Sequence, residues 1–520
     1  HADDISAVKG LVHRLFPGYE QVFSFRKTAG KTDVFSLRSE GGKIIVSGNN
    51  ANSMAVGINH YMKYYCHVEV GWLKSDTFQL PSVPPRIPKP VTIKARVKDR
   101  FFLNYCTYGY TMPWWRWDEW EHFIDWMALN GINLPLAITG QESIWYKVWS
   151  ELGLSDATIR NYFTGPAHLP WHRMINIDRW FAPLPMSWLN GQLMLQKRIT
   201  ARERELNMHP VLPAFSGHVP AELASIFPKA KITKLAPWDG YAEQYSCSFL
   251  DPMDPLFTQI QKRFIEIEDS VYGTDHVYGI DLFNEVTPPS YAPEYLSRVA
   301  KQVYASLANA DPQAIWLQMT WLFYYRQKDW TNDRIKAYLT AYPKNRSLLL
   351  DYYCDMQEMW KSTDKFFGVP FVWCYLGNFG GNTMLTGDLE TINRRMEHAM
   401  AKCKGNLAGI GATLEGFDCN PYIYEYVFEK AWNFPTNRNI QEWVNALADQ
   451  RTGKVDANAR QAWQLLVDSI YNQQTVTQQL QPFFNMRPAF MTSKMVSQIP
   501  QVDKEDKILL EVIEKLLQVD

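Results

Sequence analysis

The fold is decided by one stretch of the sequence, His276-Val277-Tyr278-Gly279-Ile280-Asp281-Leu282-Phe283-Asn284-Glu285, which is followed by Pro288-Pro289. A mostly apolar run that ends abruptly in polar residues and prolines is typical of a buried parallel strand with a carboxylate at its C-terminal end. In an α/β barrel that end carries the chemistry, so Glu285 is the first candidate for a catalytic acid, with Asn284 beside it to bind a substrate hydroxyl. The alternative is that Glu285 caps the next helix or pairs with a surface cation.

This stretch contains one of eight apolar runs in the sequence, and helical patterns lie between the runs. The runs are 101–106, 132–138, 210–215, 277–283, 314–319, 348–353, 371–375 and 408–413. Strands that alternate with helices in this way predict a (β/α)8 TIM barrel over residues 96–420. The gap between the second and third runs is too long for one helix, and Phe163-Thr164-Gly165-Pro166 and Pro170-Trp171-His172 lie within it. We expect an inserted loop region there, over the mouth of the barrel.

The regions on either side of the predicted barrel have different sequence patterns. Residues 1–80 predict a small α/β domain, with helices over 4–15 and 52–66, strands over 22–26, 33–37 and 43–47, and hairpin turns at Gly30 and Gly41-Gly42. Residues 81–95 predict a stiff linker, because five prolines fall within 81–90. Residues 421–520 predict an all-α domain with helices over 422–432, 440–449, 457–471 and 504–517, interrupted at Pro435 and Pro482.

Composition excludes some partners and favours others. The net charge of -1 argues against nucleic acid or an anionic membrane as the main partner, and no apolar run approaches the length of a membrane span. Aromatic residues make up 14% of the chain, with 20 Trp, and such rings stack on the faces of sugars. The seven cysteines are scattered without a Cys-x-x-Cys pair, which indicates neither a zinc site nor a disulfide framework.

Hydrolysis of a glycosidic bond usually needs two carboxyl groups, so a second acid must join Glu285. Three acids at strand ends are candidates: Glu142, Asp351 and Glu415. Glu415 ends the eighth run and is followed by Gly416, which permits the close backbone approach that a sugar ring demands. The alternative for Glu415 is a solvated acid in a turn.

Other motifs carry weaker signals. His168 and His172 are four residues apart, but Pro170 between them spoils a helical zinc pair, so we expect no metal. The run Asn378-Phe379-Gly380-Gly381-Asn382 indicates a glycine turn near the substrate rather than a phosphate cradle. Cys106 has no partner base in the sequence, which favours a buried or pocket-lining thiol over a nucleophile.

Nine segments also occur, in the same order, in a known family of enzymes. They are Asn104-Tyr105-Cys106-Thr107, Ile124-Asp125-Trp126-Met127-Ala128-Leu129-Asn130-Gly131-Ile132-Asn133-Leu134, Phe163-Thr164-Gly165-Pro166-Ala167, Val211-Leu212-Pro213-Ala214-Phe215-Ser216-Gly217-His218-Val219-Pro220, Tyr245-Ser246-Cys247-Ser248-Phe249, Gly273-Thr274-Asp275-His276, Phe283-Asn284-Glu285, Asn378-Phe379-Gly380-Gly381-Asn382 and Glu415. On these segments the chain resembles the α-N-acetylglucosaminidases of glycoside hydrolase family 89. The first domain also resembles the small domain that precedes the barrel in this family and in the β-hexosaminidases.

The resemblance implies an exo-acting, anomer-retaining hydrolase that removes terminal α-linked N-acetylglucosamine from glycans or glycosaminoglycans without a cofactor. It implies that Glu285 is the general acid/base and Glu415 the nucleophile, about 5 to 5.5 Å apart for a double displacement. The remaining pocket residues that it implies are Asn104, Cys106, Trp171, Trp238, Asn284, Trp321 and Tyr352.

Two departures from the family shape the remaining expectations. Family members carry a longer helical C-terminal domain than the roughly 100 residues that follow Asn420, so we expect a shortened domain here. The second departure is that the sequence has one glycosylation sequon, Asn345-Arg346-Ser347, whereas the lysosomal members generally have more. The sequence also begins at His1-Ala2, as a processed or tagged chain would. We therefore expect an exported bacterial protein, periplasmic or extracellular, or a lysosomal one if the source is an animal. A homo-oligomer is compatible with the sequence.

Two alternative functions stay open. A β-hexosaminidase-like hydrolase uses the acetamide of the substrate as nucleophile and needs an adjacent Asp-Glu pair at a strand end. The pair present, Asp118-Glu119, is expected at the start of a helix, which counts against it. A non-catalytic sugar-binding protein on a barrel scaffold would keep the tryptophans but tolerate the loss of either glutamate.

Overall fold

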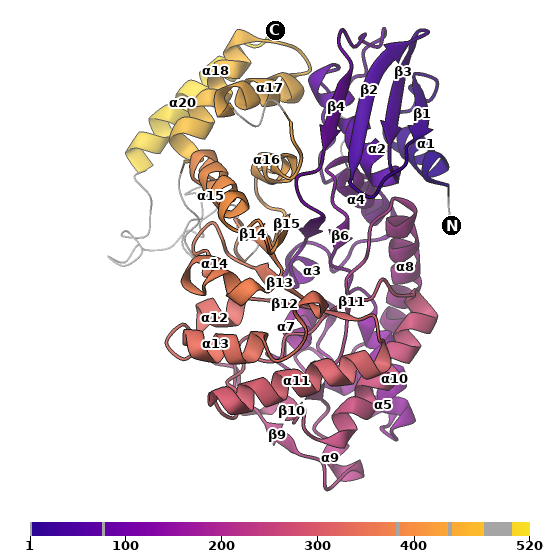
Figure 1. Ribbon diagram of the computed structural model, residues 1–520, viewed down its shortest axis with the longest axis vertical. Coiled ribbons are helices and arrows are strands. Elements are labelled where there is room, and N and C mark those ends of the chain that lie inside the picture. The colour runs from indigo at the N-terminus through magenta and orange to yellow at the C-terminus, as the bar shows by residue number, and fades with distance from the viewer. Residues whose placement is uncertain (1–2, 75–77, 381–384, 435–438, 473–501) are drawn as a thin grey trace.

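A computed structural model describes residues 3–74, 78–380, 385–434, 439–472 and 502–520 of the chain, with only the backbone for 502–506. In that part of the chain, no helix has the length and apolar character needed to cross a membrane. Figure 1 shows a small sheet domain at the N-terminus, a barrel in the middle and a group of helices at the C-terminus.

The N-terminal domain comprises α1 (Asp4–Leu15), β1 (Phe23–Lys27), β2 (Val34–Glu40), β3 (Lys43–Gly48), α2 (Ala51–Tyr64) and β4 (Val91–Lys94). Its four strands lie in the order β1-β3-β2-β4. The predicted turn at Gly41-Gly42 forms a hairpin between β2 and β3, with both glycines at positive φ, +59° and +77°. Gly30 does not form a hairpin, because β1 pairs in parallel with β3 and not with β2. Helix α2 is buried along most of its length between this sheet and a barrel helix, α4 (Trp117–Leu129).

The predicted linker differs from the structure at its end. Residues 91–94 form β4, which pairs antiparallel with β2 and so belongs to the N-terminal sheet. The prolines stop at Pro90, and the free N–H groups of the Val-Thr-Ile-Lys segment that follows can enter a sheet.

Eight parallel strands form the barrel, which confirms the predicted fold class. They are β5 (Asp99–Phe102), β6 (Leu134–Pro135), β7 (Leu212–Pro213), β11 (Val277–Gly279), β12 (Ile315–Met319), β13 (Ser347–Asp351), β14 (Phe371–Tyr375) and β15 (Leu407–Ala412). They lie in the order β6-β5-β15-β14-β13-β12-β11-β7, and a parallel bridge between Leu136 and Val211 closes the ring. Glycine is required in β15, since a Cβ at Gly411 would lie only 2.6 Å from the carbonyl oxygen of Phe101 in β5.

Helices follow the strands around the outside of the barrel (Figure 1). They include α4 (Trp117–Leu129), α8 (Met186–Glu205), α10 (Pro255–Tyr272), α11 (Pro293–Ala310), α13 (Asn332–Leu339), α14 (Met359–Ser362), η3 (Lys344–Arg346), η4 (Lys365–Gly368), α15 (Leu389–Lys402) and α16 (Tyr422–Lys430). The short helices α3 (Thr107–Tyr110) and α12 (Trp321–Tyr325) begin within two to five residues of the ends of β5 and β12.

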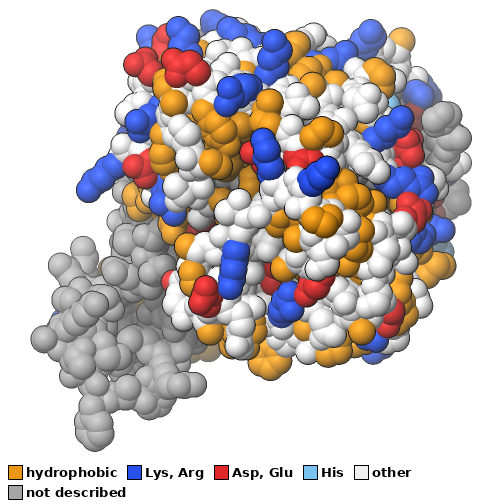
Figure 2. Space-filling view, turned by 90° about the horizontal axis from the view of Figure 1, so that it is seen from below, with side chains coloured by type: hydrophobic (Ala, Val, Ile, Leu, Met, Phe, Trp, Pro, Cys, Tyr) orange, Lys and Arg blue, Asp and Glu red, His pale blue; other side chains and the backbone are white. Residues whose placement is uncertain are grey.

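Two insertions extend the barrel. The one predicted as a loop between the second and third strands is largely helical, with α5 (Gln141–Glu151), α6 (Asp156–Tyr162), η1 (Pro166–His168) and α7 (Leu169–Arg173). Its prolines occupy first turns of η1 and α7, where a missing N–H costs nothing. The second insertion follows β7 and was not predicted. It contains β8 (His218–Val219), α9 (Leu223–Ile226), β9 (Ile232–Lys234), η2 (Glu243–Tyr245) and β10 (Ser248–Leu250), with the strands antiparallel in the order β8-β10-β9. Figure 2 shows the face of the molecule seen from below Figure 1, where acidic and basic side chains are interspersed.

The C-terminal region is helical, as predicted, in its described part. It contains α17 (Ile440–Thr452), α18 (Ala457–Leu465), η6 (Leu466–Ile470) and α20 (Val502–Leu517). The predicted breaks at Pro435 and Pro482 lie outside the described residues.

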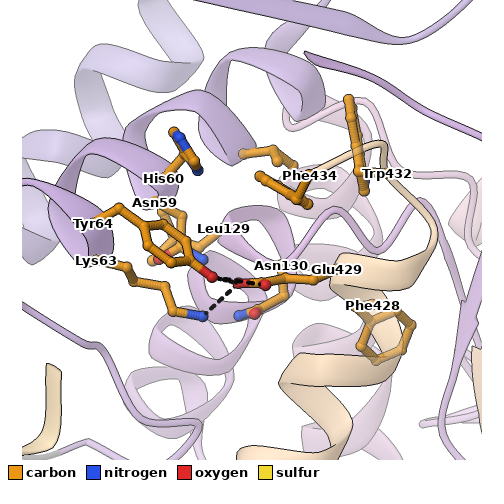
Figure 3. Close-up of a pocket in the computed structure, with 11 residues that line it drawn as sticks. Asn59, His60, Lys63, Tyr64, Leu129, Asn130, Phe428, Glu429, Trp432 and Phe434 are labelled. Carbon is orange, nitrogen blue, oxygen red and sulfur yellow. Dashed lines mark hydrogen bonds and ion pairs between the residues drawn. The ribbon is translucent and has the colours of Figure 1, made fainter. Parts of the chain in front are cut away.

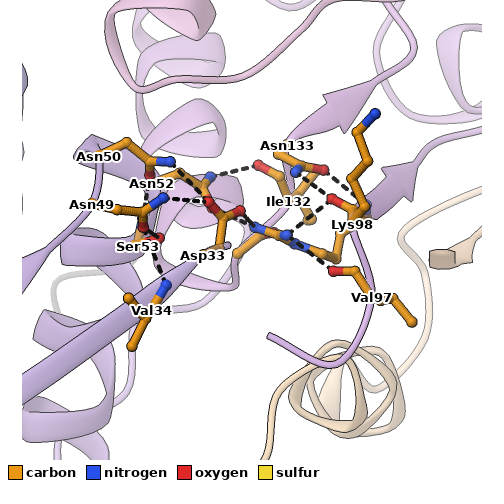
Figure 4. Close-up of polar contacts among 12 residues, drawn as sticks. Asp33, Val34, Asn49, Asn50, Asn52, Ser53, Val97, Lys98, Ile132 and Asn133 are labelled. Carbon is orange, nitrogen blue, oxygen red and sulfur yellow. Dashed lines mark hydrogen bonds and ion pairs between the residues drawn. The ribbon is translucent and has the colours of Figure 1, made fainter. Parts of the chain in front are cut away.

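Two buried polar clusters join the three parts. In the first, Arg100 of β5 is fully buried and forms a 2.8 Å ion pair with Asp33 of the N-terminal domain. Its guanidinium also donates to the Gly131 carbonyl at 2.7 Å and to the Asn52 side chain at 3.0 Å, in the network of Figure 4. Burial of such a cation is stable only because all these acceptors surround it.

The second cluster centres on Glu429 of α16. Its carboxylate accepts hydrogen bonds from Tyr64 of α2 at 2.8 Å and from Trp443 of α17 at 2.6 Å. The Lys63 ammonium pairs with the same carboxylate at 3.1 Å, beside the small cavity of about 10 Å³ drawn in Figure 3. One carboxylate thus joins the N-terminal domain, the last barrel helix and the C-terminal helices.

Candidate active site

A cavity of about 410 Å³ lies at the carboxyl ends of the barrel strands. It is placed there because its lining residues follow the ends of successive strands: Asn104 after β5, Glu285 after β11, Trp321 after β12, Tyr352 after β13 and Glu415 after β15. All nine residues predicted for the site line this cavity. Lining residues that the sequence analysis did not single out are Tyr110, Met174, Asp239, Met319, Tyr325 and Leu376.

Glu285 does not sit directly on its strand. The strand β11 ends at Gly279, earlier than predicted, and Asn284 and Glu285 lie in the loop that follows. Burial raises the pKa of Glu285, and the neighbouring charge of Asp239 raises it further. The side chain of Trp238, the charge of Arg326 and the side chain of Asn176 oppose this rise. An acid with a raised pKa keeps its proton until a leaving group needs it.

Glu415 is held by the glycine turn that the sequence singled out. The backbone N–H of Gly380 donates to its Oε1 at 2.7 Å, and the backbone N–H of Glu415 donates to the Asn378 carbonyl at 3.1 Å. Burial raises the pKa of Glu415 to about 7; the Gly380 hydrogen bond lowers it, and the charge of Glu285 adds to the rise. Because the two carboxyl groups repel each other when both are ionised, the pair favours a state with one shared proton. Gly381 and Asn382 of the same motif lie outside the described residues.

The other two candidates for the second acid lie elsewhere. Glu142 forms an ion pair of 2.7 Å with Arg173 and does not line the cavity. Asp351 accepts backbone hydrogen bonds from Met359 at 3.2 Å and Trp360 at 3.1 Å, and it does not line the cavity either. Of the three candidates, Glu415 is the one that shares the cavity with Glu285.

Asn104 and Cys106 line the same cavity as Glu415. The Asn104 amide donates to the Thr413 carbonyl at 2.9 Å and accepts from the Cys106 N–H at 2.9 Å. Burial and the two nearby glutamates raise the pKa of the Cys106 thiol well above its ordinary value. The thiol is therefore neutral, which agrees with a pocket-lining role and not with a nucleophile.

Aromatic rings form the walls. Trp171 of α7 meets Tyr110 edge to face at 5.2 Å between ring centroids, and Trp321 of α12 stacks near Tyr325 at 6.1 Å. Trp238, from the second insertion, stacks on Tyr241 at 5.9 Å. Such rings offer flat apolar faces of the kind that pack on a sugar ring.

Tyr352 closes the site beside β13. Its backbone N–H donates to Thr320 at 3.2 Å, and its carbonyl accepts from the Thr413 hydroxyl at 2.7 Å. Burial raises the pKa of its phenol well above the ordinary value, so the phenol stays a hydrogen-bond donor.

One cluster in the described residues has side chains of metal-ligand type, namely His172, Asp178 and His218. His218 Nε2 and Asp178 Oδ1 are 2.6 Å apart, which is a hydrogen-bond length. Two ligands about 2 Å from one tetrahedral zinc ion would lie about 3.3 Å from each other. The cluster therefore fits a hydrogen-bonded network better than a metal centre. His168, the other histidine weighed as a ligand, is not part of it.

Sequence reasoning missed Asp239, and a signal for it existed. It follows Trp238 directly in Trp238-Asp239-Gly240, and its backbone is in the left-handed region at φ +45°. A Trp-Asp-Gly turn predicts a sharp bend that presents both side chains together.

A parallel barrel with two half-buried carboxylic acids and aromatic side chains lining a cavity at the carboxyl ends of its strands is the arrangement typical of glycoside hydrolases. Comparison with known proteins defines the class further. The family model described as the alpha-N-acetylglucosaminidase (NAGLU) tim-barrel domain matches residues 100–434. The models of the N-terminal and C-terminal domains of the same family match residues 6–88 and 443–520.

Individual relatives agree with the family models. The human alpha-N-acetylglucosaminidase is 40% identical over 479 residues, which cover 91% of this chain and 64% of the human protein. A family 89 glycoside hydrolase from Clostridium perfringens, solved in complex with 2-acetamido-1,2-dideoxynojirmycin, matches with a TM-score of 0.89 and 26% identity, over 98% of this chain and 58% of that one. A form of the Clostridium perfringens enzyme with two Glu→Gln substitutions, in complex with its substrate GlcNAc-alpha-1,4-galactose, matches with a TM-score of 0.87 and 26% identity, over 98% and 57% of the two chains.

The chain belongs to the alpha-N-acetylglucosaminidase (NAGLU) family. It spans less than two thirds of the length of these relatives, 64% of the human protein and 58% of the first Clostridium perfringens chain.

Proposed function

We propose that this protein is an exo-acting, retaining glycosidase that hydrolyses terminal α-linked N-acetylglucosamine. The observation that carries the proposal is the shared cavity of Glu285 and Glu415, in a chain whose family relative was solved with an α-linked N-acetylglucosaminide. Both acids are held in different electrostatic surroundings, which is what two different roles require.

In the first step, Glu415 attacks the anomeric carbon while Glu285 gives its proton to the departing glycosidic oxygen. The bond between that oxygen and the anomeric carbon breaks, and the sugar becomes an ester of Glu415. The Gly380 N–H favours the ionised form of Glu415 before the attack.

In the second step, Glu285, now ionised, takes a proton from water as the water oxygen attacks the anomeric carbon. The ester bond breaks, Glu415 is released as a carboxylate, and Glu285 is protonated again. The sugar leaves with the α configuration with which it arrived.

The cavity also supports recognition of a polar sugar. The Asn284 Oδ1 is buried and has no hydrogen-bond partner in the described structure, so it is available to a hydroxyl or amide N–H. The walls of Trp171, Trp238 and Trp321 would pack on the apolar faces of the ring.

The natural substrate and the compartment belong to the same proposal. We infer that the polymer is a glycan or glycosaminoglycan, since terminal α-linked N-acetylglucosamine is the group that the cavity would accept. Such polymers lie outside the cytoplasm, which supports an exported protein, periplasmic or extracellular if bacterial and lysosomal if animal. Fractionation of source cells with an antibody to the chain would test this compartment.

The alternatives fit less well. Asp118 and Glu119 lie at the start of α4, where the Glu119 carboxylate accepts from the Arg116 N–H at 2.8 Å, and neither lines the cavity. A substrate-assisted mechanism would need such a pair inside it. A sugar-binding protein without activity would need no second carboxylic acid in the cavity beside Glu285.

Proton NMR of the sugar first released from an aryl α-N-acetylglucosaminide tests the proposal. Release of the α-anomer first supports double displacement by Glu285 and Glu415. Release of the β-anomer first would overturn the role of Glu415 as nucleophile. Binding of the sugar without any release would favour the binding protein.

A further inference from the structure

The two inserted segments meet at one buried carboxylate, Asp178. Its Oδ1 lies 2.6 Å from His218 Nε2 and 3.2 Å from His172 Nδ1, and the Cys247 thiol donates to it at 3.4 Å. His172 belongs to α7 of the first insertion, whereas His218 belongs to β8 and Cys247 directly precedes β10 in the second. Only 1% of Asp178 is exposed, so these contacts are not shared with solvent.

The part of the first insertion around Asp178 has an unfavourable backbone. Ile175 and Arg179 both have positive φ, +64° and +67°, in a region that side chains with a Cβ avoid. Such a conformation persists only where the surroundings hold it in place. Here the Asn176 N–H donates to the Trp171 carbonyl at 2.8 Å, and the Asp178 N–H donates to the Tyr245 carbonyl at 2.9 Å.

Each of the two insertions places one polar side chain near the general acid. Asn176, two residues before Asp178, lies near Glu285 and lowers the pKa of that carboxyl group, and both polar atoms of its buried amide are without a hydrogen-bond partner in the described structure. Trp238 follows β9 of the second insertion, lines the cavity together with Glu285 and also lowers the pKa of that carboxyl group. The relative position of the two insertions therefore sets how both side chains lie against Glu285.

We propose that Asp178 is a positioning residue that holds the two insertions together and thereby keeps the side chains of Asn176 and Trp238 in place near Glu285. The inference rests on the proposed function, because it concerns the general acid of that reaction. It goes beyond that function by assigning a role to a buried cluster outside the cavity.

The electrostatics of the cluster suit a contact that persists over a wide range of pH. Burial alone would raise the pKa of Asp178, but the two histidines lower it to about 2, so the carboxylate stays ionised over the working range of pH. Other titratable groups near the cluster are Cys247, Tyr162, Glu142 and Glu222. Those that face Glu285 are Asp239, Arg326, Tyr325, Cys106 and Glu415.

The sign of the effect follows from these two side chains. Both stabilise the ionised form of Glu285 and so lower its pKa. If the insertions move apart, this stabilisation is lost and the pKa of Glu285 rises. Since Glu285 must be protonated to act as the acid, the limb of the profile that falls with rising pH moves to higher pH.

The test is the pH profile of kcat/KM for Asp178→Asn in the full chain, with an aryl α-N-acetylglucosaminide as substrate. We expect the basic limb to move up by roughly half a pH unit or more, and activity at the optimum to fall about tenfold. His172→Phe, which keeps a ring of similar size but removes the contact with Asp178, should move the limb in the same direction. It also keeps the test open if Asp178→Asn does not fold.

Asp449→Asn is the matched control. Asp449 is also buried and paired, with Arg460 at 2.7 Å, but it lies in α17 of the C-terminal region. This variant should lose stability without moving the basic limb. A basic limb that stays in place in an active Asp178→Asn enzyme would overturn the inference, whereas a wild-type chain without hydrolysis would overturn the proposed function instead.

Hydrogen exchange adds a readout that needs no activity. In Asp178→Asn the backbone amides of residues 176 and 178 should exchange faster than in the wild type, because the first insertion is no longer held to the second. In Asp449→Asn they should exchange at the wild-type rate. Equal exchange in all three proteins would also overturn the inference.

Discussion

The backbone N–H of Gly380 donates a hydrogen bond of 2.7 Å to the carboxylate of Glu415. This contact ties the end of the seventh barrel strand to the acid that follows the eighth. A carboxylate accepts such a hydrogen bond more strongly than a neutral amide does, so the contact favours the ionised form of Glu415.

Glu415→Gln should therefore remove hydrolysis while sugar binding remains. Because an amide cannot attack the anomeric carbon, we expect kcat to fall at least about a thousandfold. Steady-state kinetics and calorimetric binding of N-acetylglucosamine would measure the two effects. Glu142→Gln is the control, since Glu142 pairs with Arg173 outside the cavity, and it should retain most of the activity. Hydrolysis by Glu415→Gln near the wild-type rate would remove Glu415 from the mechanism.

Glu285→Gln should show a loss that depends on the leaving group. A nitrophenolate leaves without a proton, whereas a sugar hydroxyl needs one, and general acid catalysis contributes about 10²- to 10⁴-fold. We expect the variant to lose about a hundredfold more activity on an N-acetylglucosaminyl disaccharide than on a nitrophenyl glycoside. The comparison is made by measuring kcat/KM on both substrates. An equal loss on both would show that Glu285 is not the acid.

The stability of the fold should fall as the pH rises from about 5 to 8. Burial raises the pKa values of Asp281, Asp351 and Glu415 to about 7, above those of an unfolded chain. Groups of this kind stabilise the native state fully below the unfolded pKa, about 4, and that stabilisation is lost as the pH rises through 7. Asp178, with its pKa lowered to about 2, acts in the opposite direction and only in strong acid.

Thermal unfolding between pH 4.5 and 8.5 would measure this dependence. We expect Tm to fall by several degrees over the range. Asp351→Asn should have a lower Tm at pH 5 but a weaker dependence on pH, because one of the titrating groups is gone. A Tm that rises steadily from pH 5 to 8 would contradict the expectation.

The Arg100–Asp33 pair should be strongly coupled. Removing one partner leaves the other charged and buried, so Arg100→Met and Asp33→Asn should each cost about 3 to 5 kcal/mol of the free energy of unfolding. The double variant should cost clearly less than the sum of the two. Chemical unfolding of the four proteins gives the coupling energy. The exposed pair of Arg263 and Glu151 is the control and should contribute at most about 1 kcal/mol.

The sequence was a good guide to elements with strong local patterns. The eight barrel strands are buried on both sides and so appear as apolar runs, and the hairpin at Gly41-Gly42 follows from two residues that both tolerate positive φ. The cavity was reached by reading the residues at strand ends, and the resemblance supplied Trp171 and Trp238, which no local pattern places there.

The missed features depend on contacts that are distant in the sequence. The short strands β8, β9 and β10 have only two or three residues each, too few for a period of two to be visible. Asn176 and Asp178 appear in the sequence as ordinary loop residues, and their importance comes from partners about 40 to 110 residues away. Strand length was overestimated at β11 because apolar residues continue into the buried loop after Gly279.

The strand β4 has a consequence for how the molecule unfolds. Its last residue, Lys94, accepts a backbone hydrogen bond from Asn433 at 2.9 Å, and Arg96 donates to the Ala431 carbonyl at 2.7 Å. The same short segment therefore completes the N-terminal sheet, leads into the first barrel strand and pairs with the chain just after α16. None of these parts can lose its structure without exposing the backbone groups of another. The N-terminal domain and the barrel should accordingly melt as a single cooperative unit, and a fragment cut at residue 80 would lack an edge of its own sheet.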